Sequence, residues 1–369
     1  MKTIPSLNGI RAFSIVIVIL SHLVENDKII SLHSNFRLLQ NGQFGVNIFF
    51  ILSGFLITKI LVNEYWENGN ISLMNFFMRR TLRIFPAYYF LLVIYFVLQL
   101  QGLISLNKIE WFSSITYTRQ FFKVGWLCGH FWSLSVEEFF YLIYPFTFII
   151  FYKSKERYNI ILIASVLLLF PLFRYLGSIY MPNTSGYNLF YRGDALVIGC
   201  LIGLNYDTIK VRMPNNVIYP LCALLILFIY QHANYFFLNT KLINVLIGRP
   251  GESLLDNILI SFLIVYCIEN KSNIVYKILN SRVLNFIGVL SYSLYLWQQL
   301  FMSEENIVNG WLKNLLVFPT NLFMTVIMAL ISYYVIEKPL FKLKDKFKSN
   351  RPNSLNADLD MRKINIESQ

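Results

Sequence analysis

The sequence predicts an all-α, polytopic membrane protein of about ten transmembrane helices. Of its 369 residues, 56% are hydrophobic and only 14% are charged, whereas soluble domains carry about 45–50% apolar and about 25% charged residues. The apolar residues gather in runs of about 15–20 residues, which is long enough to cross a bilayer. This composition excludes a soluble enzyme, a disulfide-stapled secreted domain and a disordered protein.

About ten apolar segments are predicted to span the membrane. The first, third and sixth are the weakest, because polar residues interrupt them. The first segment continues past any plausible cleavage point, so we expect a span there rather than a cleaved signal peptide. The segments lie near 10–30, 44–64, 84–101, 131–152, 158–176, 188–206, 216–236, 253–269, 284–303 and 314–337.

The positions of Lys and Arg predict that both termini are cytoplasmic, because cytoplasmic loops carry an excess of these residues. Basic residues recur in alternate connections, at 79–83, 153–157, 210–212 and 271–282. We expect a membrane domain over 1–340 and a polar, disordered cytoplasmic tail over 341–369. The net charge of +12 fits this topology and attraction to membrane lipids, so no nucleic-acid partner is expected.

The four cysteines indicate neither a disulfide framework nor a metal site. They contain no Cys-x-x-Cys pair and no metal-ligand spacing, and three of them lie inside apolar runs, where cysteine behaves as a small hydrophobic residue. These residues are Cys128, Cys200, Cys222 and Cys267.

Ionisable residues inside membrane spans are costly and therefore mark candidate functional sites. Arg11 and His22 are eleven residues apart, which places them on one helix face, separated by roughly 16 Å along the axis. We expect Arg11 near the cytoplasmic surface and His22 about halfway across the bilayer, where an imidazole can exchange protons near neutral pH. Alternatively, Arg11 is a topology anchor and His22 bonds a neighbouring helix.

Arg79, Arg80 and Arg83 lie within about one helical turn and precede Phe85 and Pro86. Guanidinium groups bind phosphates bidentately, so the cluster is a candidate anion site at the cytoplasmic edge. An ordinary positive-inside anchor explains the same residues, and the pattern alone favours the anchor.

Two adjacent carboxylates, Glu137 and Glu138, lie in the segment GHFWSLSVEEFFYLIYP. They point about 100° apart on a helix, so we expect one to face a polar cavity and the other to lie toward the rim. Their spacing does not say which. His130 and Trp132, at the outer end of this helix, fit residues of the membrane interface.

Arg192 and Asp194 are two residues apart and would pair with each other only across a bend at Gly193. Pairing with other helices is the preferred interpretation. Glu337, followed by Lys338 and Pro339, is interpreted as a helix end, because proline cannot continue the hydrogen-bond ladder.

These residues suit a membrane enzyme that works across the bilayer, or a proton-coupled transporter in which His22 and Glu137 form a relay. A transporter would ordinarily show paired repeats, and none is seen. A non-catalytic assembly subunit is the third interpretation, but it would not need a mid-span histidine or an arginine cluster.

Seven segments, taken in their order and spacing, resemble the acyltransferase 3 family of integral-membrane O-acyltransferases. The resemblance covers nearly the whole membrane part of the chain. The segments are LNGIRAFSIVIVILSH (7–22), FGVNIFFILSGFLIT (44–58), FFMRRTLRIFPAYY (76–89), HFWSLSVEEFFYLIYP (130–145), YRGDALVIG (191–199), SYSLYLWQQ (291–299) and IEKP (336–339).

The resemblance implies transfer of an acyl group, often acetyl, to a hydroxyl of a sugar or other polar acceptor. We expect acetyl-CoA or another acyl-CoA as the donor and a glycan or lipid-linked saccharide as the acceptor, of the O-antigen, exopolysaccharide or capsule type. The expected location is the bacterial cytoplasmic (inner) membrane. The residues after Leu340 are too few for the esterase-like domain fused in some members, so we expect the stand-alone type.

Carried over residue by residue, the family's Arg-x(10)-His signature falls on Arg11 and His22, and its Arg-x-x-Arg signature falls on Arg80 and Arg83. The carboxylate of its Trp-Ser-Leu-x-x-Glu motif falls on Glu137, a choice that the spacing left open. The other residues of these segments that we expect to support the substrate or the structure are Ser53, Trp132, Arg192, Asp194, Tyr292 and Gln298.

Gln298 stands where some members carry a second histidine, which places more of the proton chemistry on His22. In the resulting hypothesis, arginines of the 79–83 cluster hold the phosphates of acyl-CoA. His22 then acts as a general base on the acceptor hydroxyl or carries the acyl group itself. Glu137 would orient His22, and Arg11 would position the donor or stabilise developing negative charge.

Overall fold

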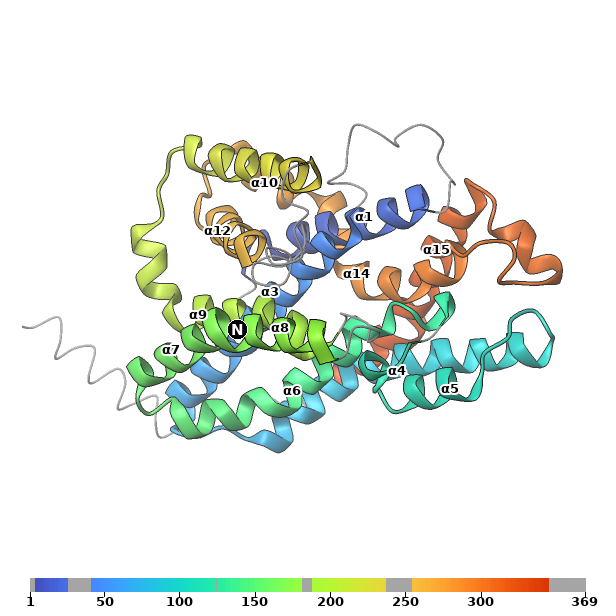
Figure 1. Cartoon of the computed structure of the whole chain (residues 1–369), viewed down its shortest axis with the longest axis horizontal. Coiled ribbons are helices and arrows are strands. Elements are labelled where there is room, and N and C mark those ends of the chain that lie inside the picture. Colours follow the sequence, from blue (N-terminus) through green and yellow to red (C-terminus); the bar gives the residue numbers. More distant parts are fainter. Residues whose placement is uncertain (1–3, 26–40, 124, 181–187, 237–253, 345–369) are drawn as a thin grey trace, which may run out of the picture.

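The computed structural model describes residues 4–25, 41–123, 125–180, 188–236 and 254–344 (Figure 1). All regular structure in these ranges is helical, which confirms the all-α prediction. The α-helices are α1 (Leu7–Glu25), α3 (Gly42–Asn68), α4 (Leu73–Leu100), α5 (Lys108–Ile115), α6 (Phe131–Phe151), α7 (Lys155–Ala164), α8 (Phe170–Tyr180), α9 (Leu189–Arg212), α10 (Ile218–Phe236), α12 (Leu254–Glu269), α13 (Ile274–Leu279), α14 (Arg282–Phe301), α15 (Thr320–Ile331) and α16 (Lys338–Lys344). Shorter pieces are the 3₁₀-helices η1 (Arg119–Phe121), η2 (Trp126–Cys128) and η4 (Gly310–Leu315), and the π-helical turns η3 (Ser165–Leu169) and η5 (Ser332–Glu337).

Each predicted span overlaps one of these helices, and six helical stretches in the described ranges are long and apolar enough to cross a membrane. The count of ten spans and the cytoplasmic side of the termini stay predictions. Most of the predicted tail lies outside the described residues. The six stretches are Leu7–Val24, Gly42–Asn68, Leu73–Leu100, Trp126–Phe151, Lys155–Leu176 and Thr320–Leu343.

One helix begins before its predicted span, and one predicted helix end is wrong. Helix α4 begins at Leu73 rather than near residue 84, because the Ser72 side chain accepts a hydrogen bond from the backbone N–H of Asn75 and caps the helix there. The arginine cluster therefore lies inside α4. The last helix does not end at Pro339 but runs on to Lys344, because the wider π turn of η5 precedes the proline and removes the clash that its ring would make in a regular helix.

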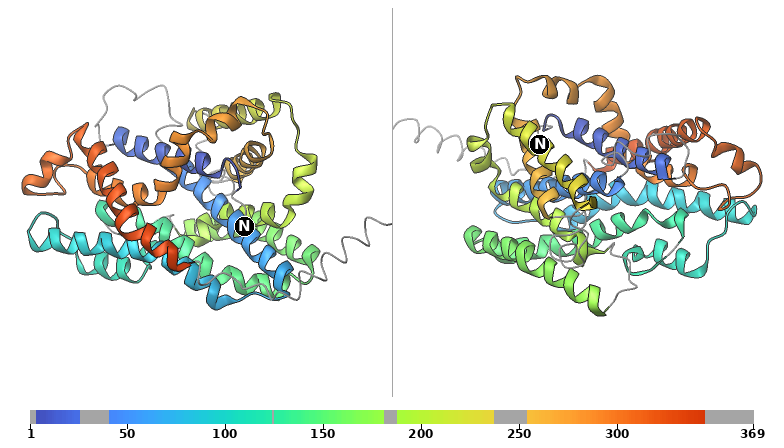
Figure 2. Two further views of the ribbon diagram at one scale, coloured as in Figure 1. Left: turned by 180° about the vertical axis from the view of Figure 1, so that it is seen from behind. Right: turned by 45° about the horizontal axis from the view of Figure 1, so that its top comes forward.

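Helix α1 packs against both α3 and α14, and α3 runs along α9 (Figure 2). Glycines bring α3 and α9 into close contact. A Cβ atom added at Gly54 would lie 2.0 Å from the carbonyl oxygen of Leu196, and one added at Gly199 would lie 2.2 Å from that of Ile51. Small residues let membrane helices approach this closely, and here they fix the turn of α3 that carries Ser53.

We predict that Gly54→Ala lowers the stability of the folded protein by about 1–3 kcal/mol, because the added methyl group forces α3 and α9 apart. The measurement is the thermal unfolding midpoint in detergent. Cys222→Ala, a small change at an exposed position of α10, is the control. An unchanged midpoint for Gly54→Ala would show that the two helices can separate without cost.

Candidate functional site

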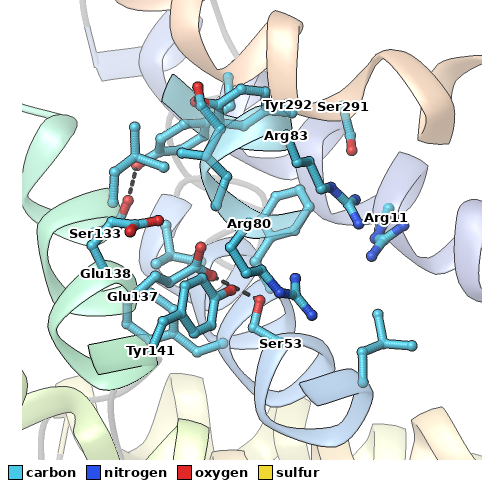
Figure 3. A pocket seen from close by; sticks show the side chains of 17 residues that line it. Arg11, Ser53, Arg80, Arg83, Ser133, Glu137, Glu138, Tyr141, Ser291 and Tyr292 are labelled. Atoms are coloured by element: carbon cyan, nitrogen blue, oxygen red, sulfur yellow. Dashed lines mark hydrogen bonds between the residues drawn. The ribbon is translucent and has the colours of Figure 1, made fainter. Parts of the chain in front are cut away.

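A cavity of about 100 Å³ lies where α1, α3, α4, α6 and α14 meet (Figure 3). We call it the arginine cavity. Its charged and polar lining consists of Arg11, Ser53, Arg80, Arg83, Ser133, Glu137, Glu138, Tyr141, Ser291, Tyr292 and Tyr295.

Three guanidinium groups, those of Arg11, Arg80 and Arg83, face this cavity from α1 and α4 (Figure 3). Among the described residues, none of the three forms an ion pair with a carboxylate. The guanidinium carbon of Arg80 lies 5.2 Å from the ring centroid of Tyr141, in a cation–π contact. Three cations without a direct counter-ion, held in one cavity, are suited to an anionic ligand such as a phosphate.

Arg79, in contrast, does not line the cavity. Its Nη2 lies 2.7 Å from Oε2 of Glu64, and Oε1 of the same carboxylate accepts the backbone N–H of Ser72 at 2.9 Å. Arg79 therefore stabilises the turn between α3 and α4, and the expected three-residue clamp is reduced on α4 to Arg80 and Arg83.

Glu137 and Glu138 both border the arginine cavity, and the expectation that one of them lies toward the rim stays a prediction. The cavity extends far enough around α6 for residues about 100° apart to reach it. Glu137 Oε1 accepts a hydrogen bond of 2.9 Å from Ser53 Oγ, which joins α6 to α3. The buried Oε1 of Glu138 has no hydrogen-bond partner in the described part of the chain.

Helix α14 is held against its neighbours at this cavity by two side chains. The hydroxyl of Tyr292 donates to the carbonyl oxygen of Ile84 at 2.8 Å. Glu337, interpreted from the sequence as part of a helix end, is buried and accepts a short hydrogen bond from Ser293 Oγ. Both contacts fix the distance between α14 and the helices that pack beside it.

A second, larger cavity of about 710 Å³ contains His22, and we call it the histidine cavity. His22 and Arg11 share a face of α1 as predicted, but they are far enough apart along the axis that they line different cavities. The charged, polar and aromatic lining consists of Ser21, His22, Asn41, Gln43, Arg119, Trp126, His130, Trp132, Tyr295 and Gln299.

Among the described residues, His22 bonds Gln298. His22 Nδ1 lies 2.6 Å from Gln298 Oε1, and the imidazole meets the ring of Trp126 edge-on at 5.2 Å between centroids. Glu137 lines the other cavity, and its expected pairing with His22 stays a prediction. Spacing along the chain could not show the bond to Gln298, because His22 and Gln298 are 276 residues apart.

The two cavities share a wall formed by Val46 and Tyr295, which line both of them. The Tyr295 hydroxyl lies 2.6 Å from Ser133 Oγ and donates to the carbonyl oxygen of His130 at 3.0 Å. These bonds anchor the wall to the start of α6.

Arg192 and Asp194 pair with other helices, as the sequence favoured. Asp194 Oδ2 lies 2.5 Å from Arg174 Nη2 on α8. Arg192 donates to Gln43 Oε1 at 2.7 Å, and its guanidinium carbon lies 5.4 Å from the ring centroid of Trp132. Arg192 therefore supports two residues that line the histidine cavity.

Sequence reasoning missed the roles of His130, Trp126 and Gln299. His130 is only 3% exposed, so it is not an interface residue. Its Nε2 donates to the carbonyl oxygen of Leu296 at 3.1 Å, and its Nδ1 has no partner among the described residues. Two features of the sequence could have indicated these roles. Gln299 directly follows Gln298, and His130 begins the segment that contains Glu137.

Burial also lowers the pKa of one arginine outside the membrane spans. Arg119, in η1, donates from Nε to the carbonyl oxygen of Cys128 at 3.2 Å. Desolvation by the surrounding protein lowers its pKa from the ordinary value. Arg119 borders the histidine cavity and ties its loop wall together.

The sequence is similar to those of known acyltransferases. The model of a family described as an acyltransferase domain matches residues 4–337. The chain is 27% identical over 373 residues to "Putative peptidoglycan O-acetyltransferase YrhL" of Bacillus subtilis, and 27% identical over 369 residues to "O-acetyltransferase OatA" of Staphylococcus aureus. Each alignment covers 92% of this chain, but the chain spans only 55% and 58% of the lengths of these relatives.

No solved structure matches the chain. The family model nevertheless extends from before Arg11 to Glu337, and so includes every residue that lines either cavity. The chain therefore belongs to the acyltransferase 3 family.

Proposed function

We propose that this protein transfers an acyl group, in the first place acetyl, from acyl-CoA to a hydroxyl of a cell-surface glycan in the cytoplasmic membrane of a bacterium. The observation that carries the proposal is the pair of cavities, one lined by three arginines and one by His22, on opposite sides of a wall of side chains. The names of the two bacterial relatives, both O-acetyltransferases and one a peptidoglycan O-acetyltransferase, support a glycan acceptor.

The donor would bind through the arginine cavity. Coenzyme A carries phosphates, and Arg80 and Arg83 offer planar guanidinium groups that match phosphate oxygens. A cavity of about 100 Å³ has room for one phosphate or for the thioester end, so the rest of the donor would lie outside it. Arg11, on the same cavity, would add a third positive charge that orients the donor near its entry.

The acceptor would bind in the histidine cavity, whose volume of about 710 Å³ is in the usual range for small-molecule sites. His22 would take the proton of a sugar hydroxyl while the hydroxyl oxygen attacks the thioester carbonyl carbon. The new ester C–O bond forms, the C–S bond breaks, and the proton passes to the leaving thiolate of coenzyme A. In the covalent variant, a ring nitrogen of His22 first bonds to the thioester carbonyl carbon, and the C–S bond breaks to release the thiolate. The hydroxyl oxygen then attacks this carbon, the C–N bond breaks, and the hydroxyl proton passes through the freed imidazole to the thiolate.

A proton-coupled transporter that uses His22 and Glu137 as a relay was the alternative from sequence. The two side chains line different cavities, and Nδ1 of His22 bonds Gln298 Oε1. This arrangement and the family membership favour acyl transfer.

We predict that His22→Ala lowers acyl transfer by about 10²-fold or more, because the hydroxyl loses its base or the acyl group loses its carrier. The assay is transfer of labelled acetyl from acetyl-CoA to glycan in membranes, with mass spectrometry of the surface glycan. Equal amounts of the variant and the wild-type protein, running alike in size-exclusion chromatography, are the control. Full activity of this variant would remove the mechanism.

A second prediction separates the three arginines. Arg80→Ala and Arg83→Ala should each raise the KM for acyl-CoA by roughly tenfold or more, because each removes charge-assisted hydrogen bonds to the donor. Arg79→Ala is the matched control. It should leave this KM unchanged and lower the thermal unfolding midpoint instead, since it leaves Glu64 without its ion pair.

If all three alanine variants changed the KM equally, Arg80 and Arg83 would have no special role toward the donor. If only Arg79→Ala changed it, the assignment of the donor to the arginine cavity would be wrong.

A further inference from the structure

We infer that Gln298 and Gln299 are positioning residues that keep the proton of neutral His22 on Nδ1 and leave the lone pair on Nε2 for the reaction. The inference rests on the proposed function for its purpose, but the presence of hydrogen on Nδ1 follows from hydrogen-bond directions alone.

A chain of three side-chain hydrogen bonds ends on a backbone carbonyl. Gln299 Nε2 lies 2.9 Å from the carbonyl oxygen of Trp126, Gln298 Nε2 lies 3.2 Å from Gln299 Oε1, and His22 Nδ1 lies 2.6 Å from Gln298 Oε1. A carbonyl oxygen only accepts hydrogen bonds, so the amide nitrogen of Gln299 must face it.

This end point sets the direction of every other bond in the chain. With its nitrogen toward Trp126, Gln299 presents Oε1 to Gln298, whose nitrogen must then donate. Gln298 is left with Oε1 toward His22. The orientation of an amide is assigned from its network, and here the network has one end that cannot be reversed.

The last bond fixes the tautomer of the histidine. Gln298 Oε1 is only an acceptor, so His22 Nδ1 must carry hydrogen. In a neutral imidazole one nitrogen is a donor and the other an acceptor, so the lone pair resides on Nε2. Nε2 is therefore the atom that takes the hydroxyl proton, or that bonds to the acyl carbon in the covalent variant.

This series of hydrogen bonds is buried, and neighbouring groups hold it at both ends. Gln298 and Gln299 are 0% and 3% exposed. The indole Nε1 of Trp126 donates to the backbone carbonyl oxygen of Gln299 at 3.0 Å, so Trp126 and Gln299 bond each other reciprocally. The same indole ring packs edge-on against His22. Reversing either amide would set two oxygens or two N–H groups against each other inside the protein.

The decisive measurement is ¹⁵N NMR of the full-length protein in lipid, with labelled histidine. The chain has four histidines, and His22→Ala identifies the signals of His22. We expect a protonated Nδ1 and an unprotonated, pyridine-type Nε2 in the wild-type protein. In Gln298→Leu the acceptor is lost, and we expect the second tautomer to become populated. A wild-type His22 with its hydrogen on Nε2 would overturn the inference.

Turnover gives an independent readout. Gln298→Leu should lower kcat by roughly tenfold or more while the KM for acyl-CoA stays nearly constant, because the base is misoriented and the donor site is untouched. Gln298→Glu retains an acceptor for the Nδ1 hydrogen but loses the N–H that Gln299 Oε1 accepts, so it should keep hydrogen on Nδ1 and have a kcat between those of Gln298→Leu and the wild-type protein. A Gln298→Leu variant with unchanged kcat would contradict the positioning role.

Gln99→Leu is the matched control. Gln99 on α4 is half-buried and accepts hydrogen bonds from the backbone N–H of Leu106 and from Trp111 Nε1, outside both cavity linings. It should leave kcat and the His22 spectrum unchanged. The NMR measurement needs no substrate, so a wild-type protein with the expected tautomer but no acyl transfer would refute the proposed function and leave the tautomer assignment intact.

Discussion

Helix α1 carries one ionisable group into each cavity, and both cavities depend on how closely it packs against α3 and α14. A Cβ atom added at Gly288 of α14 would lie only 1.9 Å from the carbonyl oxygen of Asn8, so the two backbones are in contact there. Arg11 thereby reaches the arginines of α4, and His22 reaches Gln298. Because charges are costly in hydrocarbon, the same packing is what keeps these groups inside the protein and away from lipid.

Two groups of charged side chains among the described residues have different consequences. Arg79 with Glu64, and Arg174 with Asp194, satisfy each other and brace helix pairs. Arg11, Arg80 and Arg83 instead face a cavity without a direct ion pair. The histidine cavity differs again, because His22 bonds a neutral amide. Under the proposed function, the arginines would face an anionic donor and His22 would act on the acceptor, in two cavities of one helical bundle.

The sequence predicted what depends on local pattern and missed what depends on contacts between distant segments. Apolar runs predicted the helices, and the 3.6-residue period correctly placed Arg11 and His22 on one face. The start of α4 was missed because a capped helix extends beyond its apolar part. The resemblance selected Glu137, but no spacing could pair it with Ser53 or pair His22 with Gln298, since those bonds join segments 84 and 276 residues apart.

The wall between the cavities gives a physical reason for a small acyl group. Tyr295 lies between the ring of Phe49 on one side and that of His130 on the other, at 6.4 and 5.6 Å between centroids, and its hydroxyl is bonded to α6. Under the proposed function, the thioester carbonyl must come within reach of His22 past Tyr295 or Val46. An acetyl group needs the least displacement of these side chains. Under the proposed function, the wall that would separate donor from acceptor is thus also the feature that would favour the two-carbon acyl group.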